Sequence, residues 1–126
     1  MELLLNVTTQ PGVSVVRCQG RIVFGQEVDE LRLTVLSQLK KQSRVVLNLG
    51  GIERLDSEGL AGIIGLYISA RNRGGDLKLA HLSQRSKDVV RLSHLDQIIE
   101  TYDSEADAVA SFQISKAAVT GQKRSA

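Results

Sequence analysis

The 126-residue sequence has few aromatic residues, one cysteine and one proline. Aromatics make up 3% of the chain and tryptophan is absent, so a hydrophobic core has to be built from Leu, Ile, Val and Ala. The single cysteine, Cys18, excludes an internal disulfide and is typical of a protein in a reducing compartment. It lies in a predicted strand, which favours a small buried side chain over a reactive thiol.

Long hydrophobic runs and a strong excess of one charge are also missing. The run Leu3-Leu4-Leu5 is too short for a signal peptide and stands beside Glu2, and no later run could span a bilayer. Of the 16 basic residues, three lie in the acid-free segment 115–126, so the other 13 are balanced by 14 acidic residues. We therefore expect a cytoplasmic protein with no membrane partner and no nucleic-acid partner.

The hydrophobic pattern predicts one α/β domain over residues 1–114, followed by a disordered basic tail at 115–126. Apolar runs and turn residues predict strands at 2–8, 13–19, 45–49, 77–82 and 98–102. Helical periodicity and capping residues predict helices at 26–40, from 57 to about 72, at 83–93 and from 104 to 112. Gly50-Gly51 is expected to end the third strand and begin a loop.

That loop contains Leu55-Asp56-Ser57-Glu58-Gly59-Leu60, which joins an almost unbroken apolar strand to the second helix. A serine at such a junction is held in place and presented to solvent. Backbone N–H groups and the positive end of the helix dipole point at it. The position suits either a nucleophile or a phosphoryl group.

The residues around Ser57 argue against a nucleophile. Leu55 stands where a nucleophile elbow has its first glycine, and Asp56 and Glu58 would oppose an oxyanion. Nothing places either histidine, His81 or His94, beside Ser57 as a base. The glycine spacing matches no nucleotide-binding motif, and one cysteine with two distant histidines makes no metal site. We therefore expect no enzyme, no cofactor and no metal.

A phosphate on Ser57 would act as a switch. It adds about −1.5 to −2 charges at pH 7, which the helix N-terminus can accept without a change of fold. Beside Glu53, Asp56 and Glu58, the added charge makes the loop strongly acidic and opposes a partner that docked on the neutral loop.

The helix after Ser57 has two interior glycines, Gly62 and Gly65, each costing about 1 kcal/mol relative to alanine. Two explanations remain open. Another backbone packs closely there, or a partner protein lies on a bare helix face with Leu66 as its knob.

These features together resemble the STAS domains, specifically the bacterial anti-sigma factor antagonists. The most specific part is the strand 45–49 with the Asp-Ser-x-Gly-Leu loop. The other matching residues are Gly62, Gly65, Gly74-Gly75, Leu95 with Ile98-Ile99, and Glu105-Ala106 with Phe112. The resemblance implies a mixed sheet of four or five strands flanked by about four helices.

The resemblance also implies partner switching. The unphosphorylated form would bind an anti-sigma factor kinase with a histidine-kinase-like ATP fold and so free a sigma factor. The kinase would phosphorylate Ser57 to end the complex, and a metal-dependent serine phosphatase would reverse this. Asp56 would orient the serine and Gly59 would let the partner approach. The remaining residues of the implied partner surface are Glu58, Leu60, Gly62, Gly65 and Leu66.

The sequence departs from the family pattern at two positions. Glu58 stands where a small residue is usual. In the loop after the second strand, Gly20-Arg21-Ile22-Val23, Val23 stands where the resemblance implies, for some members, an acidic residue that contacts the kinase. The alternative function is a constitutive STAS adaptor, a subunit of a transporter or signalling assembly that is never phosphorylated.

Overall fold

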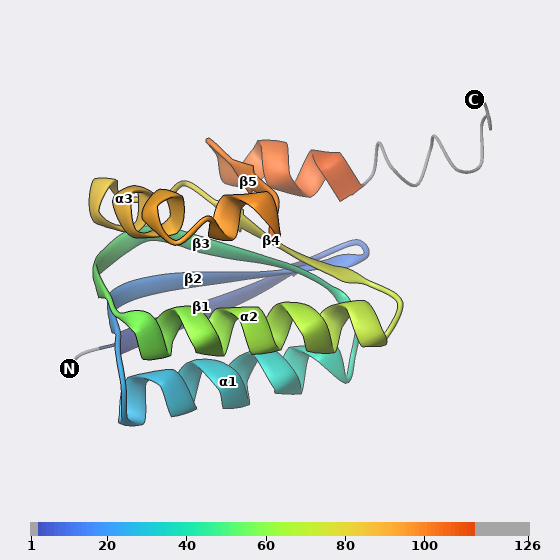
Figure 1. Ribbon diagram of the computed structural model, residues 1–126. Helices are drawn as coiled ribbons and strands as arrows, with labels where there is room; N and C mark the ends of the chain where they lie inside the picture. The colour runs from blue at the N-terminus through green and yellow to red at the C-terminus, as the bar shows by residue number, and fades with distance from the viewer. Residues whose placement is uncertain (1–2, 113–126) are drawn as a thin grey trace.

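The computed structural model describes residues 3–112 and contains one five-stranded mixed sheet in the order β1-β2-β3-β4-β5 (Figure 1). The first two strands are antiparallel, and each later strand is parallel to its neighbour. The strands are β1 Leu3–Gln10, β2 Val13–Ile22, β3 Arg44–Leu55, β4 Asp76–Ala80 and β5 Thr101–Tyr102. The predicted α/β fold with a mixed sheet is confirmed.

Helices cover both faces of this sheet. α1 (Gln26–Leu39) and α2 (Ser57–Asn72) lie side by side below it in Figure 1. α3 (Gln84–Leu92), the short 3-10 helix η1 (Leu95–Gln97) and a helix at 105–112 lie above it. Both α1 and α2 begin at the same end of the sheet, so the loops that precede them are neighbours.

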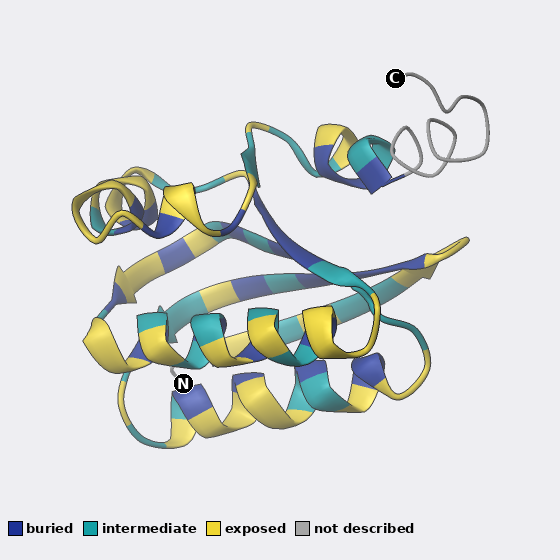
Figure 2. Ribbon diagram, turned by 45° about the vertical axis from the view of Figure 1, so that its right-hand side comes forward, coloured by how far each residue is buried: buried dark blue, intermediate teal, exposed yellow. Residues whose placement is uncertain are grey.

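The central strand β3 is buried on both faces, as its unbroken apolar run predicted. Leu47 and Leu49 belong to the larger core under α1 and α2, whereas Val46 belongs to a smaller core under the helix at 105–112. Figure 2 shows this buried band along the middle of the sheet. Cys18 is also buried, as expected.

Several element boundaries predicted from the sequence are wrong, and β2, predicted to end at residue 19, continues to Ile22. β3 does not end at Gly50-Gly51 but continues to Leu55, because β2 goes on pairing with it as far as Ile22. A Cβ at Gly51 would lie 3.1 Å from the carbonyl oxygen of Cys18, so the glycine allows the strands to come close. The strand predicted at 98–102 has only its last two residues, because η1 and the turn after it precede them.

The predicted tail at 115–126 and the first two residues lie outside the described part of the chain. Within residues 3–112, no helix has the length and apolar character needed to cross a membrane.

Candidate functional site

Ser57 is the first residue of α2 and is exposed at the carboxyl end of β3. The side chain of Leu55, two residues earlier, is buried and anchors the end of the strand. Asp56 has an extended backbone and caps the helix, so the chain turns sharply between the strand and the first helical residue. This local geometry presents the serine side chain to solvent at the N-terminus of the helix.

The Asp56 side chain holds the loop together through its two carboxylate oxygens. Oδ1 accepts the backbone N–H of Gly59 at 2.8 Å, and Oδ2 accepts the backbone N–H of Phe24 at 3.1 Å. The backbone N–H of Asp56 donates to the Ile22 carbonyl at 3.4 Å. Asp56 therefore fixes the position of Ser57 through the backbone and ties it to the loop between β2 and α1.

Gly59 is needed for packing inside the chain. It is buried, and a Cβ there would overlap the Ile22 carbonyl oxygen and lie 2.9 Å from Leu55 Cδ1. The end of β2 therefore already requires a glycine at this position, and the expected role of Gly59 in the approach of a partner stays a prediction.

The residues predicted to form a partner surface on α2 differ in how far they are buried and in what surrounds them. Leu66 is buried, with 2% of its surface exposed, so the expectation that it is a protruding knob is wrong. Leu60 is partly buried and packs against the core. A Cβ at Gly62 would lie 3.1 Å from Val28 Cγ1 of α1, so this glycine is explained by close helix packing. Gly65 is exposed, and among the described residues nothing lies within 4 Å of where its Cβ would stand.

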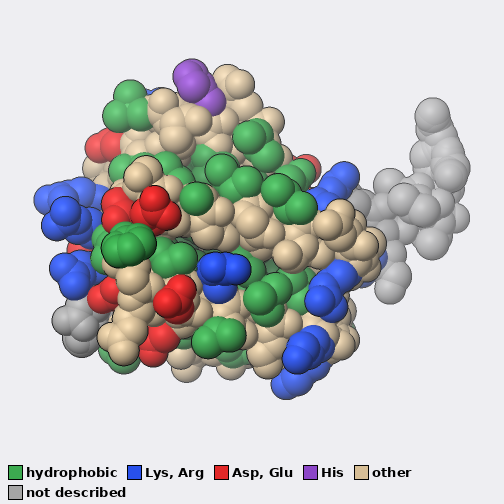
Figure 3. All heavy atoms as spheres, turned by 60° about the horizontal axis from the view of Figure 1, so that its bottom comes forward, with side chains coloured by type: hydrophobic (Ala, Val, Ile, Leu, Met, Phe, Trp, Pro, Cys, Tyr) green, Lys and Arg blue, Asp and Glu red, His purple; other side chains and the backbone are tan. Residues whose placement is uncertain are grey.

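Acidic residues gather at the end of the molecule where α1 and α2 begin. In Figure 3 this end is on the left, and basic side chains predominate on the right. Arg21 partly compensates this charge, because its Nη2 lies 3.5 Å from Glu27 Oε2. The acidic residues of the two helix starts and the preceding strand end are Glu27, Asp29, Glu30, Glu53, Asp56 and Glu58.

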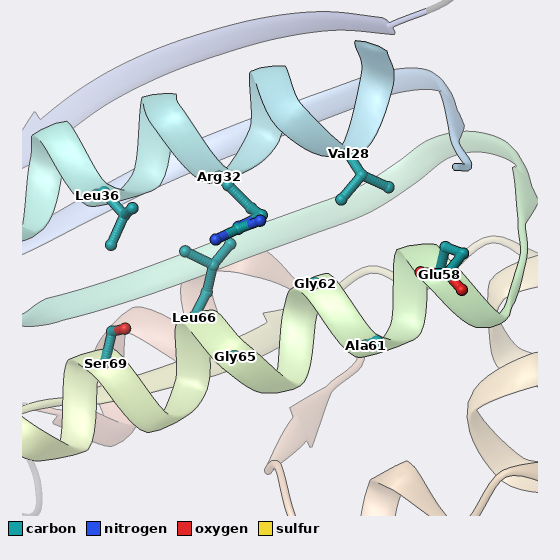
Figure 4. A pocket seen from close by; sticks show the side chains of 9 residues that line it. All are labelled: Val28, Arg32, Leu36, Glu58, Ala61, Gly62, Gly65, Leu66 and Ser69. Atoms are coloured by element: carbon teal, nitrogen blue, oxygen red, sulfur yellow. The ribbon is translucent and has the colours of Figure 1, made fainter. Parts of the chain in front are cut away.

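A shallow groove runs between α1 and α2 from the Ser57 end, with a volume of about 300 Å³ (Figure 4). Leu66 lies at its floor, and Arg32 reaches across from α1. Glu58 lines one end and Ser69 lies near the other. Glu58 therefore belongs both to the serine loop and to the groove.

Sequence reasoning missed Phe24, which lies in the loop between β2 and α1 and is 76% exposed. The signal was present, because this is one of only four aromatic residues in the chain and stands beside Gly25 in a connector. Its contact with Asp56 joins residues 32 positions apart and follows no local pattern.

The two histidines do not complete a catalytic site around Ser57. The His81 imidazole lies against Gly50 of β3, and His94 precedes η1 with a left-handed backbone. His81 was predicted inside a strand but lies one residue after β4, also with positive φ. Within residues 3–112, no group of three His, Cys, Asp or Glu side chains could hold a metal ion.

These features define a small α/β domain that presents one serine loop and one helix groove at its surface. The family model for the STAS domain matches residues 5–108. The chain belongs to the STAS domain family, which confirms the resemblance found in the sequence.

The proteins that the chain is similar to carry names of two kinds. The anti-sigma F factor antagonist of Paenibacillus polymyxa is 24% identical over 115 residues, covering 90% of this chain and 98% of the relative. The crystal structure of an anti-sigma factor antagonist from Mycobacterium paratuberculosis has a TM-score of 0.78 at 22% identity, covering 87% of this chain and 93% of that one. A sulfate transporter family protein from Wolinella succinogenes has a TM-score of 0.72 at 18% identity, covering 85% and 89%.

Proposed function

We propose that the protein is an anti-sigma factor antagonist that switches partners through phosphorylation of Ser57. The observation that carries the proposal is the exposed serine at the first position of α2, in a loop fixed by Asp56. The similarity to the anti-sigma F factor antagonist of Paenibacillus polymyxa over 90% of the chain supports the same role.

In the unphosphorylated state, the Ser57 loop and the start of α2 bind an anti-sigma factor with a histidine-kinase-like ATP fold, which releases a sigma factor. The kinase then transfers the γ-phosphoryl group of ATP to Ser57 Oγ. The Oγ–P bond forms, the bond to the leaving ADP breaks, and the hydroxyl proton is released. A metal-dependent phosphatase hydrolyses the phosphoserine and restores the binding form.

The phosphate ends binding by local electrostatics on a rigid scaffold. The N-terminus of α2 stabilises the added charge, so the domain keeps its fold. The phosphate on Ser57 then places a dianionic group on the surface that the partner would bind, next to Glu58 and near Glu53 in the sequence. Removing that group from water, without enough compensating contacts, weakens the complex.

Phosphoryl transfer is tested by incubating the protein with its cognate anti-sigma kinase and MgATP and measuring the intact mass. We expect one added phosphate, and none in Ser57→Ala. Ser69→Ala, on the same helix but near the far end of the groove, is the matched control and should be phosphorylated normally. An unmodified wild-type protein would contradict the switch.

Binding is tested by calorimetry with the same partner. Ser57→Asp should bind at least about tenfold more weakly than wild type, a loss of about 1.4 kcal/mol, while Ser57→Ala retains binding. Equal affinities for the two variants would contradict the electrostatic account.

A constitutive STAS adaptor is the second candidate. It is favoured by the structural similarity to the sulfate transporter family protein and by Glu58, which already places a negative charge beside the acceptor serine. Affinity purification from the native cell separates the two functions: recovery of an ATP-binding anti-sigma factor supports the switch, and recovery of a transporter subunit supports the adaptor.

A further inference from the structure

Phe24 is the most exposed aromatic side chain of a chain with very few aromatic residues. The chain has two Tyr and two Phe, and Phe24 is 76% exposed, whereas Phe112 is buried and both tyrosines are half-buried. A phenyl ring in water has unfavourable contact with solvent that burial would remove. Aromatic residues that lie beside a functional loop are frequent anchors of protein interfaces.

The backbone around Phe24 is fixed on both sides. The backbone N–H of Phe24 donates to Oδ2 of Asp56 at 3.1 Å, and Asp56 is the residue before Ser57. The N–H of Val28 donates to the Val23 carbonyl at 3.3 Å, and the N–H of Asp29 donates to the Gly25 carbonyl at 3.2 Å. The ring therefore has only its two side-chain torsions to lose on docking, which keeps the entropy cost of burial low.

Acidic side chains lie on both sides of Phe24, but only those toward α1 are without a bond to the backbone of the two loops. Toward the Ser57 loop lies Asp56, whose carboxylate is bonded to the N–H groups of Phe24 and Gly59. Toward α1 lie Asp29 and Glu30, both exposed in the first turns of the helix. Glu27 is held by Arg21, so Asp29 and Glu30 carry the charge that a partner would meet on this side.

We propose that Phe24 is the apolar anchor of the surface on which the anti-sigma factor docks. The partner presents an apolar pocket for the ring, with Lys or Arg side chains on the side that faces Asp29 and Glu30. This inference rests on the proposed function for the identity of the partner. What it adds is the role of one side chain, the exposed ring of Phe24, in the loop before α1.

The Asp56 side chain also links Phe24, the proposed anchor, to Ser57, the proposed phosphorylation site. Asp56 binds the N–H of Phe24 with one carboxylate oxygen and the N–H of Gly59 with the other. The ring and the serine therefore keep a fixed mutual position, so a partner that seats the ring must also meet Ser57. A phosphate on the serine then opposes docking of the whole surface.

The test is calorimetry with the anti-sigma kinase, using wild type, Phe24→Ala and Leu92→Ala. Leu92 is the matched control, because it is 81% exposed but lies on α3, on the opposite face of the sheet. We expect Phe24→Ala to weaken binding about 30-fold, a value typical of an interface anchor, and Leu92→Ala to leave it within twofold. Urea midpoints should be unchanged in both variants, because neither side chain is buried.

A kinetic measurement separates docking from chemistry. With Phe24→Ala as the substrate, we expect the KM for phosphorylation to rise and kcat to stay within twofold, since Phe24 does not touch the reacting atoms. The charge component is tested with Asp29→Lys, which should lower affinity and reduce its salt dependence. Asp103→Lys, an exposed acid after β5, should do neither.

The outcomes distinguish the two levels of the proposal. If wild type is bound and phosphorylated but Phe24→Ala binds equally well, the anchor is refuted and the proposed function stands. If wild type neither binds nor accepts phosphate from an anti-sigma kinase, the proposed function fails and the anchor falls with it.

Discussion

The three glycines of α2 make a graded test of how its packing works. Alanine at Gly59 would place a methyl group against the Ile22 carbonyl oxygen and 2.9 Å from Leu55 Cδ1. At Gly62 the methyl would lie 3.1 Å from Val28 Cγ1, and at Gly65 it would meet nothing within 4 Å among the described residues. The same substitution on one helix thus meets a fixed backbone, a side chain and open space.

The expected free energies of unfolding follow from these contacts. Alanine in a helix interior is favoured over glycine by about 1 kcal/mol, so Gly65→Ala should stabilise the protein by about 0.5–1 kcal/mol. At Gly62 this gain is offset by the small shift that Val28 must make, and the net change should be close to zero. At Gly59 the obstacle is a backbone oxygen, and overpacking of that kind costs about 1–3 kcal/mol or more. The gain is also smaller in the first turn, so we expect a net loss of about 2 kcal/mol.

Equilibrium urea unfolding measures all three variants, with stability compared at a common m-value. The predicted order of stability is Gly65→Ala, then wild type and Gly62→Ala together, then Gly59→Ala. A Gly59→Ala protein as stable as wild type would refute the close approach of β2 to α2. A clear loss of stability in Gly65→Ala would show that its surroundings are not open.

The Gly65 variant also decides between the two explanations that the sequence left open for this glycine. Because the site is open, close packing inside the chain does not explain it. If a partner seats closely on the groove, Gly65→Ala should bind several-fold more weakly although it is more stable. Unchanged affinity would mean that the partner does not reach this part of α2.

Two further predictions concern buried or paired groups. Burial raises the pKa of the Cys18 thiol to about 12, so at pH 8 roughly one folded molecule in 10⁴ carries a thiolate. Iodoacetamide should therefore label Cys18 at least about 100-fold faster in protein unfolded by urea than in the folded protein. Equal labelling rates in the two states would contradict the burial of Cys18. Hydrogen bonds from Arg17, and then from Asn48, hold the pKa of Glu105 below its usual 4.5. A lowered folded-state pKa means that the carboxylate stabilises the fold at neutral pH and that this contribution is lost as pH falls below 4.5. The urea midpoint of Glu105→Gln should therefore fall less than that of wild type between pH 7 and about pH 4, and parallel curves would refute this role.

The sequence alone was sufficient for the features that depend on local patterns. Strand and helix alternation, the burial of Cys18 and the position of Ser57 at the start of α2 all follow from hydrophobic periodicity and capping chemistry. The helix predicted at 83–93 begins where capping chemistry places it, since the Ser83 hydroxyl accepts the N–H of Ser86, three residues on. The STAS family was also recognisable, because its loop motif is contiguous in the chain.

Tertiary structure alone decided the features that depend on residues distant in sequence. β3 continues past Gly50-Gly51 because β2 pairs with it, and Gly59 is required because Ile22 lies against it. Leu66 is buried by packing of α2 against α1 and the sheet, so an apparently bare helix face became the floor of a groove. Phe24 stands beside Ser57 only because the two loops meet at the same end of the sheet. Periodicity shows which face of an element is apolar, but only packing shows which element covers that face and what remains open to a partner.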